Sequence, residues 1–271
     1  MPIAMPVTTT IPLANLSETE FKALDYEVMG HVFASHNDLG RFHDERIYEL
    51  DLQARLLEAG LGPVETEVLL TASWKDFTKT YRLDLVVQRG LVYELKSASA
   101  LTGEHKTQLL NYLLLLGLSR GKLVNFRGPS VEARFVSTQL TPEMRRRIHC
   151  DTMRWRDISP ACARLRETLV ELLHDWGAFL ELALYREALV WFLGGAEQVT
   201  RRLDIHRQSI RLGTQPADLH ASNAAFRLTA YTDSLEPAEA HLRRYLQHTD
   251  LSVLQWINFH HHQITFTTLT R

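Results

Sequence analysis

The pattern of hydrophobic positions begins with a helical period. Ser17 followed by Glu20 is a capping-box pattern, and it predicts a helix that begins there and ends at about Ser35. A second helix is predicted over about 43–58. Its apolar residues at helical spacing are Ile47, Leu50, Ala54 and Leu57. Residues 1–16, ahead of both helices, carry no charge, and we expect them to form a loose leader.

The period then becomes alternating, which is typical of strands. Three short runs that are β-branched or alternating cover 64–70, 81–87 and 91–95. Short loops separate them, so an antiparallel meander is expected. A helix over 104–118 and strands over 122–126 and 133–136 follow. The order α-α-β-β-β-α-β-β lacks strict βαβ alternation, so it predicts an α/β (α+β) sandwich over 17–140 rather than a Rossmann unit.

A second domain is expected after Thr141-Pro142, where arginines become frequent. Its predicted helices cover 162–176, 178–193 and 237–247, and its predicted strands cover 225–230 and 264–269. We expect 141–271 to be a mostly helical accessory domain with some strand. Such a domain would help to select a substrate, bind a protein partner or mediate self-association.

Composition and charge exclude several classes of protein. The chain has 271 residues, and its 30 basic and 32 acidic residues give a net charge of −2, which by itself indicates neither a nucleic-acid binder nor a membrane-surface protein. Two cysteines, Cys150 and Cys162, exclude a disulfide framework and a four-cysteine metal site. The apolar runs are far shorter than the roughly 20 residues of a membrane span, and no secretory signal is seen, so we expect a cytoplasmic protein.

Candidate chemistry is concentrated between Tyr81 and Tyr112. Glu94 and Lys96 are two residues apart on a predicted strand, so their side chains share a face. A two-residue turn before that strand would put Asp84 and Glu94 on opposite faces. A three-residue loop that ends with Gly90 in the left-handed conformation sets Asp84 directly opposite Glu94, and we predict this register.

Two carboxylates placed opposite each other repel, and a divalent cation between them would reverse the sign of that interaction. Carboxylate oxygens with a backbone carbonyl and waters suit Mg²⁺, with Mn²⁺ as a substitute. Lys96 could then stabilise an attacking hydroxide or the charge on a phosphate in the transition state. These residue types therefore indicate a metal-dependent site that cleaves phosphodiesters.

The motif resembles that of the PD-(D/E)XK nuclease superfamily, in which an aspartate precedes Glu-x-Lys on the next strand, here Asp84 and Glu94-x-Lys96. The α-β-β-β-α-β order is similar to the core of that restriction-endonuclease-like fold. The helix that follows carries Gln108-x-x-x-Tyr112, which resembles the fourth motif of the RecB-like branch.

A closer resemblance is to the small GxxExxY proteins of this superfamily. The segment from Leu39-Gly40 to Tyr48 contains Glu45 at the position of the motif glutamate. Phe42 stands where the glycine that names the motif is found. The resemblance covers about residues 26–138.

The resemblance implies a Mg²⁺-dependent nuclease, with DNA favoured over RNA as the substrate. Asp84, Glu94 and the backbone carbonyl of Leu95 would bind the metal, Glu45 would complete the acidic cluster, and Lys96 would be the catalytic lysine. Gln108 and Tyr112 lie one helical turn apart on one face, so they would order the site or touch a phosphate.

The same residues are also compatible with a protein of another class, a catalytically inactive nucleic-acid-binding or scaffolding module that retains the nuclease fold. Metal binding separates the two, because an inactive module need not bind Mg²⁺. Asp44 and Glu49, which flank Glu45, are expected to face solvent. The arginines from Arg145 onward form either a phosphate-tracking patch or a solvated helix face, and the sequence favours neither.

Overall fold

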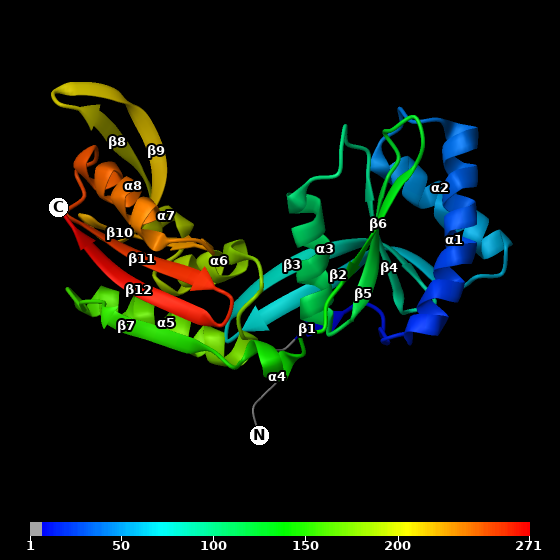
Figure 1. Ribbon diagram of the computed structural model, residues 1–271, viewed down its shortest axis with the longest axis horizontal. Helices are drawn as coiled ribbons and strands as arrows, with labels where there is room; N and C mark the ends of the chain where they lie inside the picture. The colour runs from blue at the N-terminus through cyan, green and yellow to red at the C-terminus, as the bar shows by residue number, and fades with distance from the viewer. Residues whose placement is uncertain (1–6) are drawn as a thin grey trace. The chain divides into compact units, whose positions relative to one another are not determined.

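The computed structural model describes residues 7–271, which form two compact units. The first ends at Thr141 and the second is Pro142–Arg271. Each unit is built on one six-stranded sheet (Figure 1). Across the described residues, no helix combines the length and the apolar character that crossing a membrane requires.

The sheet of the first unit has the order β1-β2-β3-β4-β5-β6. Only β4 and β5 run parallel to each other, so the expected antiparallel meander and α/β class are confirmed. The strands are β1 (Val7–Thr9), β2 (Val64–Trp74), β3 (Phe77–Val87), β4 (Leu91–Lys96), β5 (Arg120–Asn125) and β6 (Glu132–Ser137). The helices are α1 (Glu18–Leu39), α2 (Glu45–Glu58) and α3 (Gly103–Leu116), with α1 and α2 on one face of the sheet and α3 on the other (Figure 1).

Side-chain caps define where two of these helices begin. Ser17 accepts a hydrogen bond from the Glu20 amide and Glu20 caps Ser17 in return, so the predicted capping box is confirmed. Thr102 and His105 form the same arrangement before α3. These caps determine where α1 and α3 begin.

The predicted register of β3 and β4 is confirmed. Leu85 pairs with Tyr93 and Val87 with Leu91, which sets Asp84 opposite Glu94. The inward residues of both strands are buried against α1 and α2. This core includes Phe21, Val28, Val32, Tyr48, Leu52, Leu56, Leu85, Val87, Leu91, Tyr93 and Leu95.

Helix α2 buries a different face from the one that its apolar spacing indicates. Ile47, Leu50 and Leu57 are exposed, whereas Tyr48 is fully buried, stacked on Phe126 with ring centroids 4.1 Å apart. The helix carries two neighbouring apolar stripes, and spacing alone does not choose between them. The one that holds the aromatic ring packs on the sheet.

The loop between β3 and β4 has the predicted length and a different conformation. Gln88 and Arg89, rather than Gly90, have positive φ, at 48° and 59°. A Cβ on Gly90 would lie 2.6 Å from Cγ of Leu16 and 2.8 Å from the carbonyl oxygen of Ala14. Glycine is therefore required by the close approach of another segment and not by a left-handed backbone.

That segment belongs to the leader, so the expectation of a loose leader is wrong for residues 7–16. Strand β1 pairs antiparallel with β2, from Val7 opposite Ala72. The Ala14 amide donates to the Arg89 carbonyl oxygen over 2.8 Å. Residues 1–6 lie outside the described part of the chain.

The second unit has the sheet order β7-β12-β11-β10-β9-β8. Its strands are β7 (His149–Arg154), β8 (Thr200–Arg207), β9 (Ile210–Ala221), β10 (Ala224–Thr229), β11 (Val253–His260) and β12 (Gln263–Thr270). Its helices are α4 (Pro142–Arg145), α5 (Pro160–Trp176), α6 (Leu182–Phe192), α7 (Ala196–Val199) and α8 (Leu235–Gln247). The unit is rich in helix as expected, and its sheet is larger than the two predicted strands.

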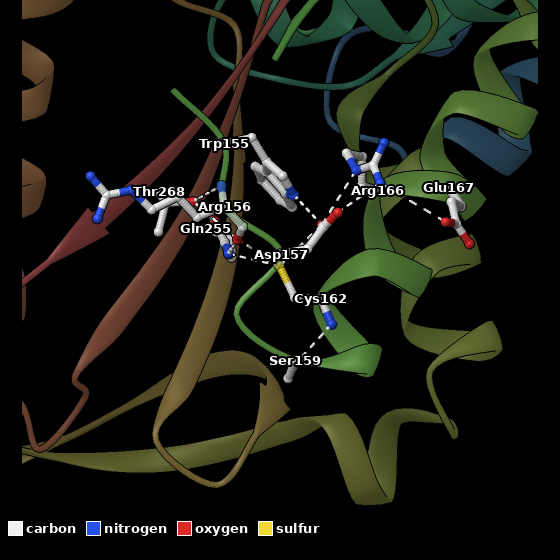
Figure 2. A network of polar contacts seen from close by, with 9 residues as sticks. All are labelled: Trp155, Arg156, Asp157, Ser159, Cys162, Arg166, Glu167, Gln255 and Thr268. Atoms are coloured by element: carbon white, nitrogen blue, oxygen red, sulfur yellow. Dashed lines mark hydrogen bonds and ion pairs between the residues drawn. The ribbon is translucent and has the colours of Figure 1, made fainter. Parts of the chain in front are cut away.

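A polar network anchors the start of α5 to this sheet (Figure 2). Gln255 on β11 donates to the sulfur of Cys162 over 2.8 Å and to the carbonyl oxygen of Arg156 over 3.1 Å. Asp157 accepts hydrogen bonds from Trp155 and Arg166. Cys162 is buried and held in this network.

We predict that Gly90→Ala lowers the free energy of unfolding by about 1–3 kcal/mol, because the added methyl group overpacks the contact with Ala14 and Leu16. Urea denaturation followed by circular dichroism measures the change.

The matched control is Gly30→Ala on the exposed face of α1, where an added Cβ meets nothing within 4 Å. We expect it to raise the free energy of unfolding by up to about 1 kcal/mol. An equal effect of the two substitutions would contradict this account of Gly90.

Candidate active site

The candidate site lies where β4 ends beside its parallel neighbour β5. Lys96, the last residue of β4, pairs in register with Asn125, the last residue of β5. The Asn125 side chain accepts from the Ala98 amide over 3.0 Å and donates to the Ala98 carbonyl oxygen over 2.8 Å. The chain that leaves β4 is therefore fixed by β5 as it passes the site.

Three carboxylates from three different elements converge on one ammonium group. Nζ of Lys96 donates to Oε1 of Glu94 over 2.6 Å. It lies 3.8 Å from Oε2 of Glu45 on α2 and 3.9 Å from Oδ2 of Asp84 on β3. The structure thus brings together the four charged residues that the sequence singles out.

Backbone amides hold two of these carboxylates. Asp84 accepts from the Leu95 amide over 2.7 Å, and Glu45 accepts from the Ser97 amide over 3.1 Å. The Ser97 hydroxyl donates to the His43 carbonyl oxygen over 2.8 Å, which ties the segment before α2 to the end of β4. The carboxylates are therefore positioned before any ligand binds.

Burial dominates the electrostatics of the site. It raises the pKa of Asp84 to about 8, and the neighbouring Glu94 adds to that increase. Burial also raises the pKa of Glu94 to about 6, against the opposing effect of Lys96. Burial alone would lower the pKa of Lys96, but the nearby carboxylates outweigh it and hold that pKa above its ordinary value.

The donor set fits a hard divalent cation. Oε2 of Glu94 is buried and has no hydrogen-bond partner, and an ion would satisfy it. Two carboxylates suit Mg²⁺, which takes few protein ligands and retains water. Within residues 7–271, no three His, Cys, Asp or Glu side chains stand ready to hold an ion, so protein side chains would fill only part of the coordination shell.

Gln108 and Tyr112 share a face of α3 as predicted, and they bond to each other. Nε2 of Gln108 donates to the Tyr112 hydroxyl over 2.9 Å. The Tyr112 ring makes an edge contact with Tyr81, with centroids 5.6 Å apart. Gln108 and Tyr112 therefore hold each other on α3.

The expectation that Glu49 faces solvent is wrong, because the structure buries it with 4% of its surface exposed. It lies one turn after Glu45 on α2 and pairs with Arg46 over 2.5 Å. Its negative charge raises the pKa values of Asp84 and Glu94. Glu49 is four residues after Glu45, and this spacing is the sequence signal that places both side chains on the same side of α2. Asp44 is exposed as expected.

Part of the chain is similar to a known family of proteins. Residues 22–136 match the PD-(D/E)XK nuclease superfamily. The match contains Glu45, Asp84, Glu94 and Lys96 and lies wholly within the first unit. Nucleases of this superfamily generally use divalent metals.

One solved structure with a similar chain is described as "Crystal structure of SSO0001". It is 25% identical over 45% of this chain and 60% of that chain, with a TM-score of 0.28. This chain therefore spans less than two thirds of that protein. No curated protein shows significant similarity to the chain.

We predict that Asp84→Asn stabilises the metal-free protein at pH 8. The folded chain keeps the Asp84 proton up to about pH 8, whereas an unfolded chain releases it near the ordinary aspartate pKa of 3.8. The folded state therefore binds more protons across this window, and its stability falls as the pH rises from about 4 to about 8. Asparagine retains the acceptor for the Leu95 amide without the charge, so the gain should be roughly 1–3 kcal/mol at pH 8 and near zero at pH 4.

Urea unfolding in EDTA at both pH values measures the difference. Glu27→Gln, on the exposed face of α1, serves as the control and should show no pH-dependent gain. A loss of stability for Asp84→Asn at pH 8 would mean that the charged form is the one that the fold prefers.

Proposed function

We propose that the first unit is a divalent-metal-dependent nuclease that hydrolyses phosphodiester bonds. The observation that carries the proposal is the convergence of Glu45, Asp84 and Glu94 on Lys96 at the end of β4. Asp84 and Glu94 are largely buried, and carboxylates packed this closely are costly without a cation, while Lys96 supplies a single positive charge. The superfamily match over 22–136 supports the same conclusion.

In this proposal Asp84 and Glu94 hold the metal ion with the backbone carbonyl of Leu95. A bound Mg²⁺, or Mn²⁺ in its place, neutralises phosphate charge and lowers the pKa of bound water. Lys96 stabilises the nucleophile or the charge that develops on the phosphate. Glu45 and Glu49 set the negative potential of the site, and Gln108 with Tyr112 orders the α3 side.

We further propose DNA rather than RNA as the substrate, and an accessory role for the second unit in substrate or partner choice. Three arginines of that unit are already buried or paired. Arg145 is buried, Arg154 pairs with Glu239 and Arg166 pairs with Asp157. These contacts leave fewer free charges for a phosphate track, and we propose contacts with protein, including self-association, as the role of the second unit.

The proposal predicts cleavage of nucleic acid with Mg²⁺ or Mn²⁺ and none with EDTA. Plasmid, single-stranded DNA and RNA are incubated with the purified protein and resolved on gels. Lys96→Ala should lower the cleavage rate at least about 100-fold, because it removes a charge that acts on the transition state. Glu94→Gln should act in the same direction.

The matched control is Lys106→Ala, an exposed lysine on α3, which should leave the rate unchanged. Cleavage that survives Lys96→Ala would point to a contaminating enzyme. Absence of cleavage by the wild-type protein, with no Mg²⁺ or Mn²⁺ binding by calorimetry, would favour the inactive binding or scaffolding module instead.

A further inference from the structure

An exposed aromatic ring near the candidate active site has two arginines close to it. Phe42 lies in the segment between α1 and α2, with 74% of its surface exposed. The Arg41 guanidinium lies 5.0 Å from the centre of its ring and the Arg127 guanidinium 6.0 Å from it. Single exposed apolar residues are common on protein surfaces, but a ring flanked by two guanidinium groups has a specific chemistry.

This cluster is joined to the site by a short chain of contacts. Nε of Arg127 donates to the Ser97 carbonyl oxygen over 3.4 Å. The Ser97 hydroxyl donates to the carbonyl oxygen of His43, the residue after Phe42, and the Ser97 amide donates to Glu45. Phe42 is therefore connected through its neighbour His43 and through Ser97 to the carboxylate of Glu45.

The charges around the ring suit a phosphate chain. Within the described residues, neither Arg41 nor Arg127 forms an ion pair with a carboxylate, so both charges remain available to a ligand. A positively charged surface that includes an exposed aromatic ring is the arrangement by which proteins bind single-stranded nucleic acid, with a base on the ring and phosphates on the cations. A base inside a duplex offers no open face for such stacking.

We propose that Phe42, with Arg41 and Arg127, is a stacking platform for an unpaired base of single-stranded DNA next to the cleavage site. This inference rests on the proposed nuclease function and names its substrate class. The base stacks on the Phe42 ring, and the Arg41 and Arg127 guanidinium groups contact the phosphates on either side of it. The platform directs the neighbouring phosphodiester toward Lys96 and the three carboxylates.

Binding is tested in EDTA, where no cleavage is expected, by fluorescence anisotropy of a labelled oligonucleotide as a single strand and as a duplex. Phe42→Ala should weaken single-strand binding by about 5- to 100-fold, the range for loss of one stacking ring, and change duplex binding by less than about twofold. Phe42→Trp should retain the affinity. Arg41→Ala should reduce the slope of log affinity against log salt by about one.

Two further measurements make the test specific. Tyr26→Ala, which removes another ring that is 83% exposed on α1, should leave the affinity unchanged. A 2-aminopurine base in the single strand should lose fluorescence on binding to the wild type and not to Phe42→Ala, which reports stacking directly.

Unchanged single-strand affinity in Phe42→Ala, an equal loss for the duplex, or no binding at all would overturn the proposal. Tighter binding of single-stranded RNA of the same sequence would overturn the choice of DNA. Binding that depends on Phe42 without any cleavage in Mg²⁺ would uphold the platform and reject the nuclease function, so the two failures are distinguishable.

Discussion

The burial of like charges beside one another is the constraint on which the first unit depends. Asp84 and Glu94 lie opposite each other on neighbouring strands, and both are shielded from water. In a medium of low polarity the repulsion between the two charged carboxylates is strong, and either a proton on Asp84 or a nearby cation relieves it. Lys96 is that cation, because its ammonium group lies between Glu45, Asp84 and Glu94. The site therefore stores an unfavourable interaction that a divalent ion would relieve.

The layers of the fold explain why this face of the sheet is shielded. Val86 and Val92 lie on the same face as Asp84 and Glu94, and both are fully buried. The apolar half of α3 covers this side, since a Cβ on Gly121 of β5 would lie within 3.3 Å of Leu109 and Leu113. Carboxylates at the rim of such a layer are partly desolvated, and their pKa values rise accordingly.

The sequence can predict what depends on strand alternation and on local capping. The three-residue loop and the alternation of β3 and β4 are enough to place Asp84 opposite Glu94. The face of α2 cannot be predicted in this way, because Tyr48 and Ile47 lie on adjacent stripes and only the stacking on Phe126 decides between them. With Tyr48 packed on the sheet, its neighbour Glu49 is buried as well. The need for glycine at position 90 comes from the close approach of Leu16, which is distant in the chain, and so does not follow from local turn preferences.

A buried network of polar side chains on the opposite face of β4 helps to orient the residues of the site. Tyr93 points away from Glu94 because successive strand residues alternate, and its hydroxyl donates to Asp25 of α1 over 2.5 Å. Lys122 of β5, in register with Tyr93, donates to the other oxygen of Asp25 over 2.9 Å. All three groups are buried, so rotation of β4 about its axis would break the Tyr93–Asp25 hydrogen bond and leave buried polar groups without a partner. The network on the α1 side thus fixes the direction in which Glu94 and Lys96 point on the other side, and it does so at the residue that precedes Glu94 in the strand.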